Sequence, residues 1–461
     1  DAVSYNFRKK YVVDLSYRMD GSSGSGSENP YSRNPAVGVR WNFHRENLFE
    51  NSEWLSNGAL RLTWGKNIVP SRSLDALYGR YNLVGNYNNN PGILIDFDKL
   101  PNPYLKPTTT EQYNFGFDAG FFNNRFEVIF DAYYKEVQNL EMEKFLANST
   151  GFNKFYSNDG GIANYGYELY LSARPLSPNS PVNWTISVNG AVNKDVLISL
   201  PPEFNGQAIH WDDSWAKQHT LFRVGSNTLS NYLRTNQGVY ASDEDVPVDP
   251  ATGLRYRTGG RFFEGGDPIL KDVNQDYILD SRDYEMSGNS QPRVTGGIAT
   301  MLNYKGFGLN VYASFTLKRT ILNNALADRF RLMGDPFGNK AVVPLDGLDM
   351  WRQPGDIAKY PYAYDYSRYE QIDPFRLDQT LWAEEGSYLK INQVTLSYMF
   401  TKKVVHRIGL SNLRIYFSTD NLVTFSPYSG PNPENVTSMG RDASGGYPVP
   451  RTYTLGLNLE L

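Results

Sequence analysis

The chain closes with RTYTLGLNLEL (451–461), and this stretch shows the pattern that decides the fold. From Tyr453 onward the odd-numbered positions hold tyrosine or leucine, whereas the even-numbered positions hold Thr, Gly, Asn and Glu. Successive side chains of a β-strand point to opposite faces, so this stretch predicts a strand with one apolar and one polar face. Its length suits a tilted strand that crosses a membrane, which needs about 9–11 residues.

The same alternation recurs along the chain, and we expect about twelve strands in all. The other expected strands lie near 11–20, 37–43, 60–64, 113–119, 126–134, 165–174, 184–188, 294–302, 307–315, 388–400 and 413–423. Asn123-Asn124 is expected to form one hairpin turn because asparagine tolerates positive φ, and 304–306 to form another. The sequence therefore predicts an all-β fold, an antiparallel transmembrane β-barrel portion that has 451–461 as its closing edge.

Short and long connections alternate between these strands. The short ones lie near 45–57, 123, 175–182, 305 and 402–412, and the long ones near 21–34, 67–110, 140–161, 199–291, 318–386 and 424–450. Outer-membrane barrels place short turns in the periplasm and long loops outside the cell. With the closing strand running inward, every long connection falls outside, so 199–291 and 318–386 are predicted to be long extracellular loops. A short helix is expected near 321–333.

The composition of the chain excludes several classes of protein. A net charge of −4 disfavours nucleic-acid binding, which requires basic surfaces. The absence of cysteine excludes disulfides and thiolate metal sites within the 461 residues. The sequence has no apolar run near 18 residues, so a transmembrane helix is not expected.

Seven stretches, in family order, resemble the SusC/RagA-type TonB-dependent transporters of Gram-negative outer membranes. They are YVVDLSYRMDGSS (11–23), NPAVGVRWNFHREN (34–47), LKPTTTEQYNFGFDAGFFNNRFEVIFDAYYKEV (105–137), DVNQDYILDSRDY (272–284), GSYLKINQVTLSYMF (386–400), NLVTFSPYSGPNPE (421–434) and YPVPRTYTLGLNLEL (447–461). Two local departures are Leu461, where an aromatic residue is usual at the C-terminus, and Tyr277, where the family pattern expects glycine.

The resemblance implies a barrel of about 22 strands around a plug domain. Residues 1–461 would supply about 12 of these strands, as the C-terminal part of the barrel, and we recognise neither a plug domain nor a TonB-engaging segment in them. It further implies import of oligosaccharides or peptides across the outer membrane. The implied partners are the TonB complex, a SusD-like surface lipoprotein and outer-membrane lipid, but not nucleic acid.

The stretch 272–283 carries a candidate calcium site. Asp272, Asn274, Asp276, the Ile278 carbonyl, Asp280 and Asp283 occupy positions 1, 3, 5, 7, 9 and 12 of a calcium loop. Against calcium, Tyr277 stands where the loop needs positive φ, which costs a residue other than glycine roughly 1–2 kcal/mol. The alternative is a solvated acidic loop that has Lys271 and Arg282 as counterions.

Other residues with functional potential favour a structural interpretation. Trp211, Trp215, Trp351 and Trp382 lie in the long loops, where they either stack on a ligand or, as we favour, pack loop against loop. His44, His210, His219 and His406 lack metal-ligand spacing. Glu384 and Glu385 are adjacent, so in extended backbone they point apart and make a poor acid–base pair.

These observations predict a SusC-like importer, with a scaffold role in a larger outer-membrane complex as the alternative. A secreted glycan-active enzyme is disfavoured by the sorting of loops, and no catalytic residue is assigned. We also expect the closing strand to pair with a strand outside residues 1–461, because a free edge in hydrocarbon leaves backbone groups without partners.

Overall fold

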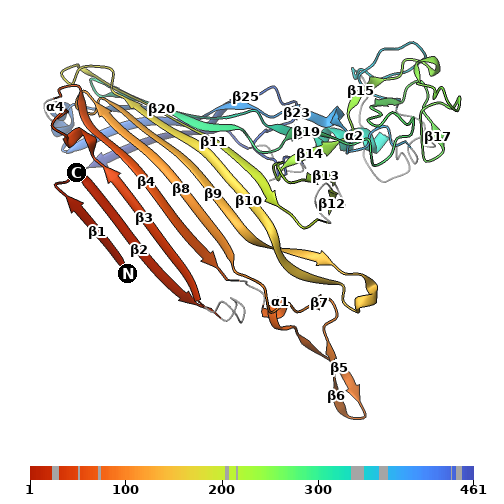
Figure 1. Cartoon of the computed structure of the whole chain (residues 1–461). Coiled ribbons are helices and arrows are strands. Elements are labelled where there is room, and N and C mark those ends of the chain that lie inside the picture. The colour runs from red at the N-terminus through yellow and green to blue at the C-terminus, as the bar shows by residue number, and fades with distance from the viewer. Residues whose placement is uncertain are drawn as a thin grey trace.

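The computed structural model describes residues 1–22, 31–49, 52–70, 74–202, 207–213, 216–333, 347–362, 372–437, 439–442 and 449–460. These residues form one large sheet and a body of shorter elements at one end of it (Figure 1). None of the helices in these ranges is long and apolar enough to span a membrane.

The large sheet is fourteen-stranded, and apart from β7 each strand pairs antiparallel with the strand that precedes it along the path of the sheet. The path consists of β1 (Ala2–Phe7), β2 (Tyr11–Gly21), β3 (Tyr31–Trp41), β4 (Leu55–Val69), β8 (Thr108–Phe121), β9 (Phe126–Phe145), β10 (Lys154–Ala173), β11 (Val182–Ser199), β20 (Val294–Tyr304), β21 (Phe307–Leu317), β24 (Tyr388–Met399), β25 (Asn412–Phe425) and β26 (Thr452–Glu460). The short strand β7 (Lys99–Leu100) adds to β10 in parallel orientation. Every strand expected from the sequence is present.

Strand β1 is an addition to the expected set. It pairs with β2 through a tight turn in which Arg8 and Lys9 both have positive φ, at 51° and 57°. Such turns normally contain glycine or asparagine at these positions, so the sequence lacks the usual hairpin signal. Among the described residues, β1 pairs only with β2 and β26 only with β25. Tyr11–Gly21 and Thr452–Glu460 therefore do not pair with each other.

The register of the sheet places all the apolar faces on one side. Leu455 lies opposite Phe417, which lies opposite Leu396, and the same row continues through Leu309 and Leu302. The neighbouring row, on the other side of the sheet, is polar, with Thr454, Ser418, Thr395 and Asn310 in register. The alternation seen in single strands thus becomes one apolar and one polar surface.

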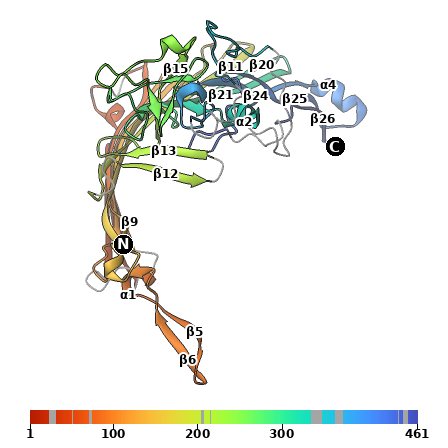
Figure 2. The same ribbon diagram turned by 90° about the vertical axis from the view of Figure 1, so that its right-hand side faces the viewer.

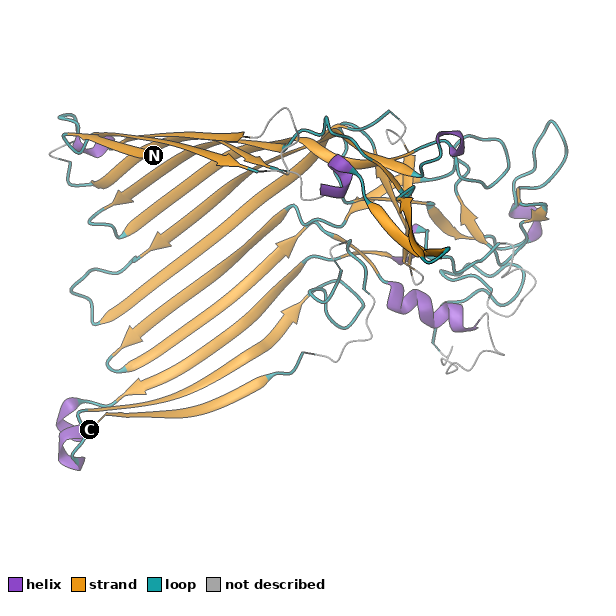
Figure 3. Cartoon of the chain, turned by 90° about the horizontal axis from the view of Figure 1, so that it is seen from below, coloured by secondary structure: helices purple, strands orange, loops and turns teal. Residues whose placement is uncertain are grey.

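The short connections gather at one end of the sheet and the long ones at the other (Figures 1 and 3). The short helix α4 (Lys402–Val405) lies at the short-turn end, with the C-terminus close by. The hairpin between β8 and β9 turns over 122–125, longer than the expected asparagine pair, and Phe122, Asn123 and Asn124 all have positive φ. The turn at Lys305 and Gly306 is as predicted.

One predicted loop, 140–161, is mostly strand. β9 continues to Phe145 and β10 begins at Lys154, and the two pair along this extension with register shifts near Ser157 and Gly160. The apolar alternation is interrupted before this extension, because Glu136 and Gln138 stand on the face that carries Phe130 and Tyr134, so the sequence predicts the loop too early. The ladder itself persists because backbone hydrogen bonds do not require a lipid-facing pattern.

The long loops carry their own elements. They are α1 (Leu74–Tyr78), β5 (Tyr81–Tyr87), β6 (Asn90–Ile95), β12 (Gln207–Asp213), β13 (Ala216–Phe222), β14 (Ser230–Leu233), β15 (Asn236–Val239), β16 (Arg257–Thr258), β17 (Arg261–Phe262), β18 (Pro268–Leu270), β19 (Glu285–Asn289), β22 (Thr320–Leu322), α2 (Asn324–Met333) and β23 (Ala383–Glu385). Helix α2 confirms the helix expected near 321–333, although Ile321 itself belongs to β22. Seen from the loop end, the sheet curves like part of a barrel wall, and hairpin β12–β13 lies on its concave side (Figure 2).

Candidate functional site

The polar face of the sheet carries an ion-pair network that joins three strands. Arg61 of β4 donates to both carboxylate oxygens of Asp118 of β8, at 3.0 and 2.8 Å. The same guanidinium donates to Asp131 of β9 at 3.1 Å, and Asn114 donates to Asp131 at 3.0 Å. Charged and amide side chains of this kind line the water-filled interior of a barrel, and they are costly on a lipid-facing surface.

Two long loops, 199–291 and 318–386, fold into a single body. Ile372, from the second loop, is fully buried in a core of first-loop residues that includes Tyr256, Phe263 and Leu279. Backbone hydrogen bonds cross between the loops in both directions, from Arg234 to Asp378 and from Thr380 back to Arg234, each at 2.9 Å. Long loops therefore gain their order by sharing a core.

A buried charge cluster lies at this junction. Asp378 accepts hydrogen bonds from the Arg376 guanidinium at 2.5 and 2.9 Å and from the Tyr284 hydroxyl. The Arg234 guanidinium lies 3.7 Å from Asp378 and 4.3 Å from the centre of the Tyr284 ring. Burial alone would raise the pKa of the Asp378 carboxyl, but Arg376 outweighs it and holds that pKa well below its usual range. Burial raises the pKa of Tyr284 to about 12.

The third long loop, 424–450, joins the same body in its described part. The backbone N–H of Leu322 donates to the Gly440 carbonyl at 2.8 Å, and the Leu322 carbonyl accepts from Asp442 N at 3.0 Å. Ala325 donates to the Asp442 carbonyl at 3.2 Å. The Tyr428 hydroxyl donates to the Asp442 carboxylate, and the buried Arg441 donates to Asn324 at 3.3 Å. Three loops that are distant in the sequence thus form one structure above one end of the sheet.

The predicted calcium loop, 272–283, is a compact turn in which carboxylates accept hydrogen bonds from the backbone. Asp272 accepts from Tyr277 N at 2.7 Å, and Asp276 accepts from Ile278 N at 2.9 Å. Tyr277 has φ of 60°, so it does adopt the left-handed conformation that the loop requires. Asp283 is fully buried and accepts from the backbone of Val273 at 3.0 Å.

The charges of this loop are partly neutralised by arginine. Arg282 donates to Asp276 and, at 2.6 Å, to Asp280, and its hydrogen bonds lower the pKa of Asp280. Lys271, the other expected counterion, instead pairs with Glu285 at 2.5 Å. Within the described ranges, groups of three or more His, Asp or Glu side chains arranged to hold a metal ion do not occur. Calcium binding by Asp272, Asn274, Asp276, Ile278, Asp280 and Asp283 stays a prediction.

Of the loop tryptophans that the structure describes, Trp351 packs against the other long loop, as favoured from the sequence, whereas Trp382 packs within its own loop. Trp382 is fully buried beside Phe330 and donates from Nε1 to the Arg376 carbonyl at 2.8 Å. Trp351 donates to the carbonyl of Ala241, in the other long loop, at 3.0 Å. The side chain of Trp211 and the whole of Trp215 lie outside the described residues.

The four histidines lie in two separate regions, His44 and His406 at the short-turn end and His210 and His219 in a loop hairpin. His44 Nδ1 bonds with the Gly58 carbonyl at 2.8 Å near the short-turn end, and His406 is exposed there beside α4. His210 and His219 are opposite each other in the β12–β13 ladder, but their side chains lie outside the described part. Glu384 contacts Asn323 and Ser429, whereas its neighbour Glu385 contacts Ser387. Their separate partners make an acid–base pair implausible, as expected.

Hairpin β5–β6 is a feature that the sequence analysis missed. It projects from the loop end beyond the sheet (Figures 1 and 2). Tyr81 pairs with Ile95 and Leu83 with Ile93, so one face of the hairpin is apolar, and the exposed fraction of Leu83 is 75%. The turn residues Asn88 and Asn89 both have positive φ. An asparagine pair between two apolar runs was the available signal, although the surrounding Pro and Asn residues indicated an irregular loop.

Comparisons with known proteins extend over the whole chain. Residues 2–335 match the family described as TonB dependent receptor-like, beta-barrel. The chain is 27% identical over 476 residues to TonB-dependent receptor P3 of Formosa agariphila, covering 99% of the chain and 45% of that protein. It is 25% identical over 474 residues to TonB-dependent receptor SusC of Bacteroides thetaiotaomicron, covering 99% of the chain and 43% of SusC. The chain thus spans less than half the length of these relatives.

The backbone is similar to solved structures of the same architecture. It matches a chain of the RagAB peptide importer in its open-open state with a TM-score of 0.79 and 20% identity, covering 100% of this chain and 46% of the other. A second RagAB structure matches with a TM-score of 0.74 and 21% identity, covering 100% of this chain and 47% of the other. This likeness confirms the predicted barrel fold.

Proposed function

Because the chain belongs to the TonB-dependent receptor-like β-barrel family of the outer membrane, we propose that the whole protein imports oligosaccharides or peptides. The energy would come from an inner-membrane TonB complex, and a SusD-like surface lipoprotein would bind at the loop end. The relatives are receptors, so the proposed function contains no chemical step and no catalytic residue. Substrates of both classes stay in the proposal, since one similar structure is a peptide importer.

The observation that carries this proposal is the combination of a polar sheet face with a large ordered loop body at one end of it. Arg61, Asp118 and Asp131 offer hydrogen-bonding groups to a polar solute that passes along the inner wall. The shared core in which Ile372 packs against Tyr256 and Phe263 keeps the long loops ordered above that wall. Ordered loops held by a rigid scaffold are the usual place for solute recognition in proteins of this architecture.

Hairpin β5–β6 supports the proposed lipoprotein partner. Its apolar face carries Tyr81, Leu83, Ile93 and Ile95, which are all exposed in the described structure. Contiguous exposed apolar surface rimmed by polar residues is typical of protein–protein contacts. The hairpin extends on the extracellular side, where lipid cannot cover it, so a protein that binds at the loop end is the occupant we favour.

The test is uptake by cells that carry the full-length protein. Fluorescent peptides and oligosaccharides are supplied separately, with and without a protonophore, and a strain lacking the protein is the control. The proposal expects one class to accumulate, and accumulation to stop when the proton gradient that energises TonB is removed. The alternative scaffold role is correct if two results occur together. Uptake of both classes would equal that of the strain lacking the protein, and a larger membrane complex that is intact in wild-type cells would be lost in that strain.

A further inference from the structure

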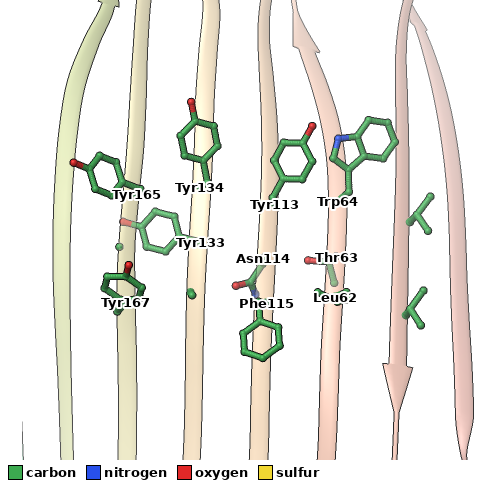
Figure 4. A pocket seen from close by; sticks show the side chains of 14 residues that line it. Leu62, Thr63, Trp64, Tyr113, Asn114, Phe115, Tyr133, Tyr134, Tyr165 and Tyr167 are labelled. Carbon is green, nitrogen blue, oxygen red and sulfur yellow. The ribbon is translucent and has the colours of Figure 1, made fainter. Parts of the chain in front are cut away.

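The apolar face of the sheet contains a groove of about 710 Å³ that crosses strands β3 to β10 (Figure 4). Ala132 of β9 lies opposite Phe115 on β8 and opposite Tyr167 on β10. The small side chain of Ala132 therefore lies between two aromatic side chains in one row of residues across the strands. Along its own strand Ala132 is flanked on this face by Phe130 and Tyr134, so the missing side-chain volume is enclosed on four sides.

The groove ends, toward the long loops, at a row of aromatic side chains. Trp64, Tyr113, Tyr134 and Tyr165 are in register on four neighbouring strands and lie side by side in Figure 4. Aromatic girdles of this kind mark the level at which a barrel passes from hydrocarbon to lipid headgroups. Because this row faces the long-loop end, the predicted extracellular position of the long loops places the groove in the outer half of the membrane.

The next row outward on the same face is charged, which fixes the boundary. Lys66 pairs with Glu111 at 3.3 Å, and the Tyr134 hydroxyl donates to Glu136 at 2.9 Å. Glu111 and Glu136 are themselves opposite each other in the β8–β9 ladder. Moving two residues along each strand, to the next position on the same face, thus changes the side chains from apolar to ionic. Such a change is expected where acyl chains meet headgroups.

We propose that this groove holds an acyl chain of outer-leaflet lipopolysaccharide. The surface belongs to the bilayer-facing side of an outer-membrane barrel, so hydrocarbon is what surrounds it. A groove left empty would forfeit the dispersion contacts of the aromatic rings that line it, and a flexible chain restores them. The tyrosine hydroxyls at its outer end, among them Tyr113 and Tyr165, lie where ester and phosphate groups of the same lipid would accept hydrogen bonds.

A folded protein partner fits this groove less well. The strands that form the groove continue their apolar faces beyond it, as with Leu169 on β10, and their backbone groups are paired in the ladder. A polar rim, which normally surrounds a protein interface, is present only on the outer side. The site requires that the protein is in the outer membrane with its long loops outside the cell, so it is independent of the proposed transport.

The experiment is native mass spectrometry of the full-length protein extracted in mild detergent, with retained lipid followed through increasing detergent exchange. Ala132→Phe and the smaller Ala132→Leu fill the groove, and Ala313→Phe is the matched control. Ala313 is also an apolar-face alanine, but it lies between Ile298 and Ile391 and outside the groove. Heat-modifiable migration on gels, a property of folded barrels, confirms that each variant has folded.

The wild type and Ala313→Phe should retain lipopolysaccharide at least several-fold more than the two groove-filling variants. Equal retention in all four proteins would overturn the proposal. Retention of phospholipid in place of lipopolysaccharide, with the same dependence on Ala132, would also overturn the proposal, because the acyl chain in the groove would then belong to a phospholipid. Loss of a protein dimer in the groove-filling variants would instead identify a second copy as the occupant.

Discussion

The carboxylate of Asp378 lies 3.7 Å from the guanidinium of Arg234, and both side chains are almost fully buried between two loops that are far apart in the sequence. Two nitrogens of Arg234, Nε and Nη1, have no hydrogen-bond partner among the described residues. The ion pair and the Tyr284 ring are therefore what stabilise its charge. This arrangement makes the stability of the loop body depend on a single carboxylate.

Asp378→Asn should release the loop body while the barrel stays folded. Removing one partner of a buried charge cluster takes from Arg234 and Arg376 the carboxylate they share, and breaking a buried ion pair typically costs about 3–5 kcal/mol. Limited proteolysis should cut 199–291 and 318–386 faster in this variant than in the wild type, with unchanged heat-modifiable migration. The control is Glu244→Gln, an exposed position in the same loop. Equal proteolysis of the two variants would contradict the role assigned to Asp378.

The loop body should tolerate mild acid. The folded pKa of Asp378 is lowered from its usual range, so its contribution to stability is present above the unfolded pKa of about 3.9 and is lost only as pH falls through the folded value. Hydrogen exchange of the loop amides should therefore show no Asp378-dependent loosening between pH 7 and about 4.5. A wild-type transition near pH 6 that is absent in Asp378→Asn would refute this assignment.

The calcium prediction is tested most sharply through Arg282. Calcium must displace this guanidinium from Asp276 and Asp280, so Arg282→Gln should increase the affinity for calcium, and Asp276→Ala should abolish binding. Elemental analysis of the purified full-length protein, before and after chelation, gives the measurement. If the stretch is only an acidic loop, Arg282→Gln will disorder it by leaving its carboxylates unpaired, and the protein will contain no calcium.

The orientation of the barrel is tested by cysteine labelling, for which this chain offers a clean background because it contains no native cysteine. Thr252→Cys, exposed in a long loop, should react with a membrane-impermeant maleimide on intact cells. Lys403→Cys, exposed in α4 at the short-turn end, should react only after the outer membrane is opened. Labelling in the opposite order would reverse the topology.

The proposed lipoprotein contact depends on the apolar face of hairpin β5–β6. The double variant Leu83→Asn/Ile93→Asn should lower co-purification of the lipoprotein with the full-length protein, because it removes apolar surface at the centre of that face. Val248→Asn/Leu254→Asn, exposed elsewhere in the loops, is the matched control. If as much lipoprotein co-purifies with the hairpin variant as with the wild type, this contact is excluded. The uptake assay tests transport independently of this contact.

The closing strand is proposed to pair with a strand outside residues 1–461. In the described structure β26 is hydrogen-bonded to β25 on one side only. In the full-length protein, amides of Tyr453–Leu459 that point away from β25 should therefore exchange as slowly as those that point toward it. Rapid exchange of that outward set would show that the edge remains unpaired.

The sequence determined the faces of the sheet and the sorting of its connections. Alternation from Tyr453 to Leu459 is a local property with a period of two residues, and it correctly indicated one apolar and one polar face. Local signals also placed the turn at Lys305 and the helix α2. Where no such signal exists, the prediction failed, as with the Arg8–Lys9 turn and the extension of β9 to Phe145 beyond the polar Glu136 and Gln138.

Only the tertiary structure decided how the long loops fold and where the groove lies. Ile372 is buried among residues of another loop, and Ala132 borders a groove only because Phe115 and Tyr167 lie beside it in the sheet. Such relationships depend on which residues pair across strands and on which loops share a core. They join positions far apart in the chain, so no local pattern of side chains encodes them.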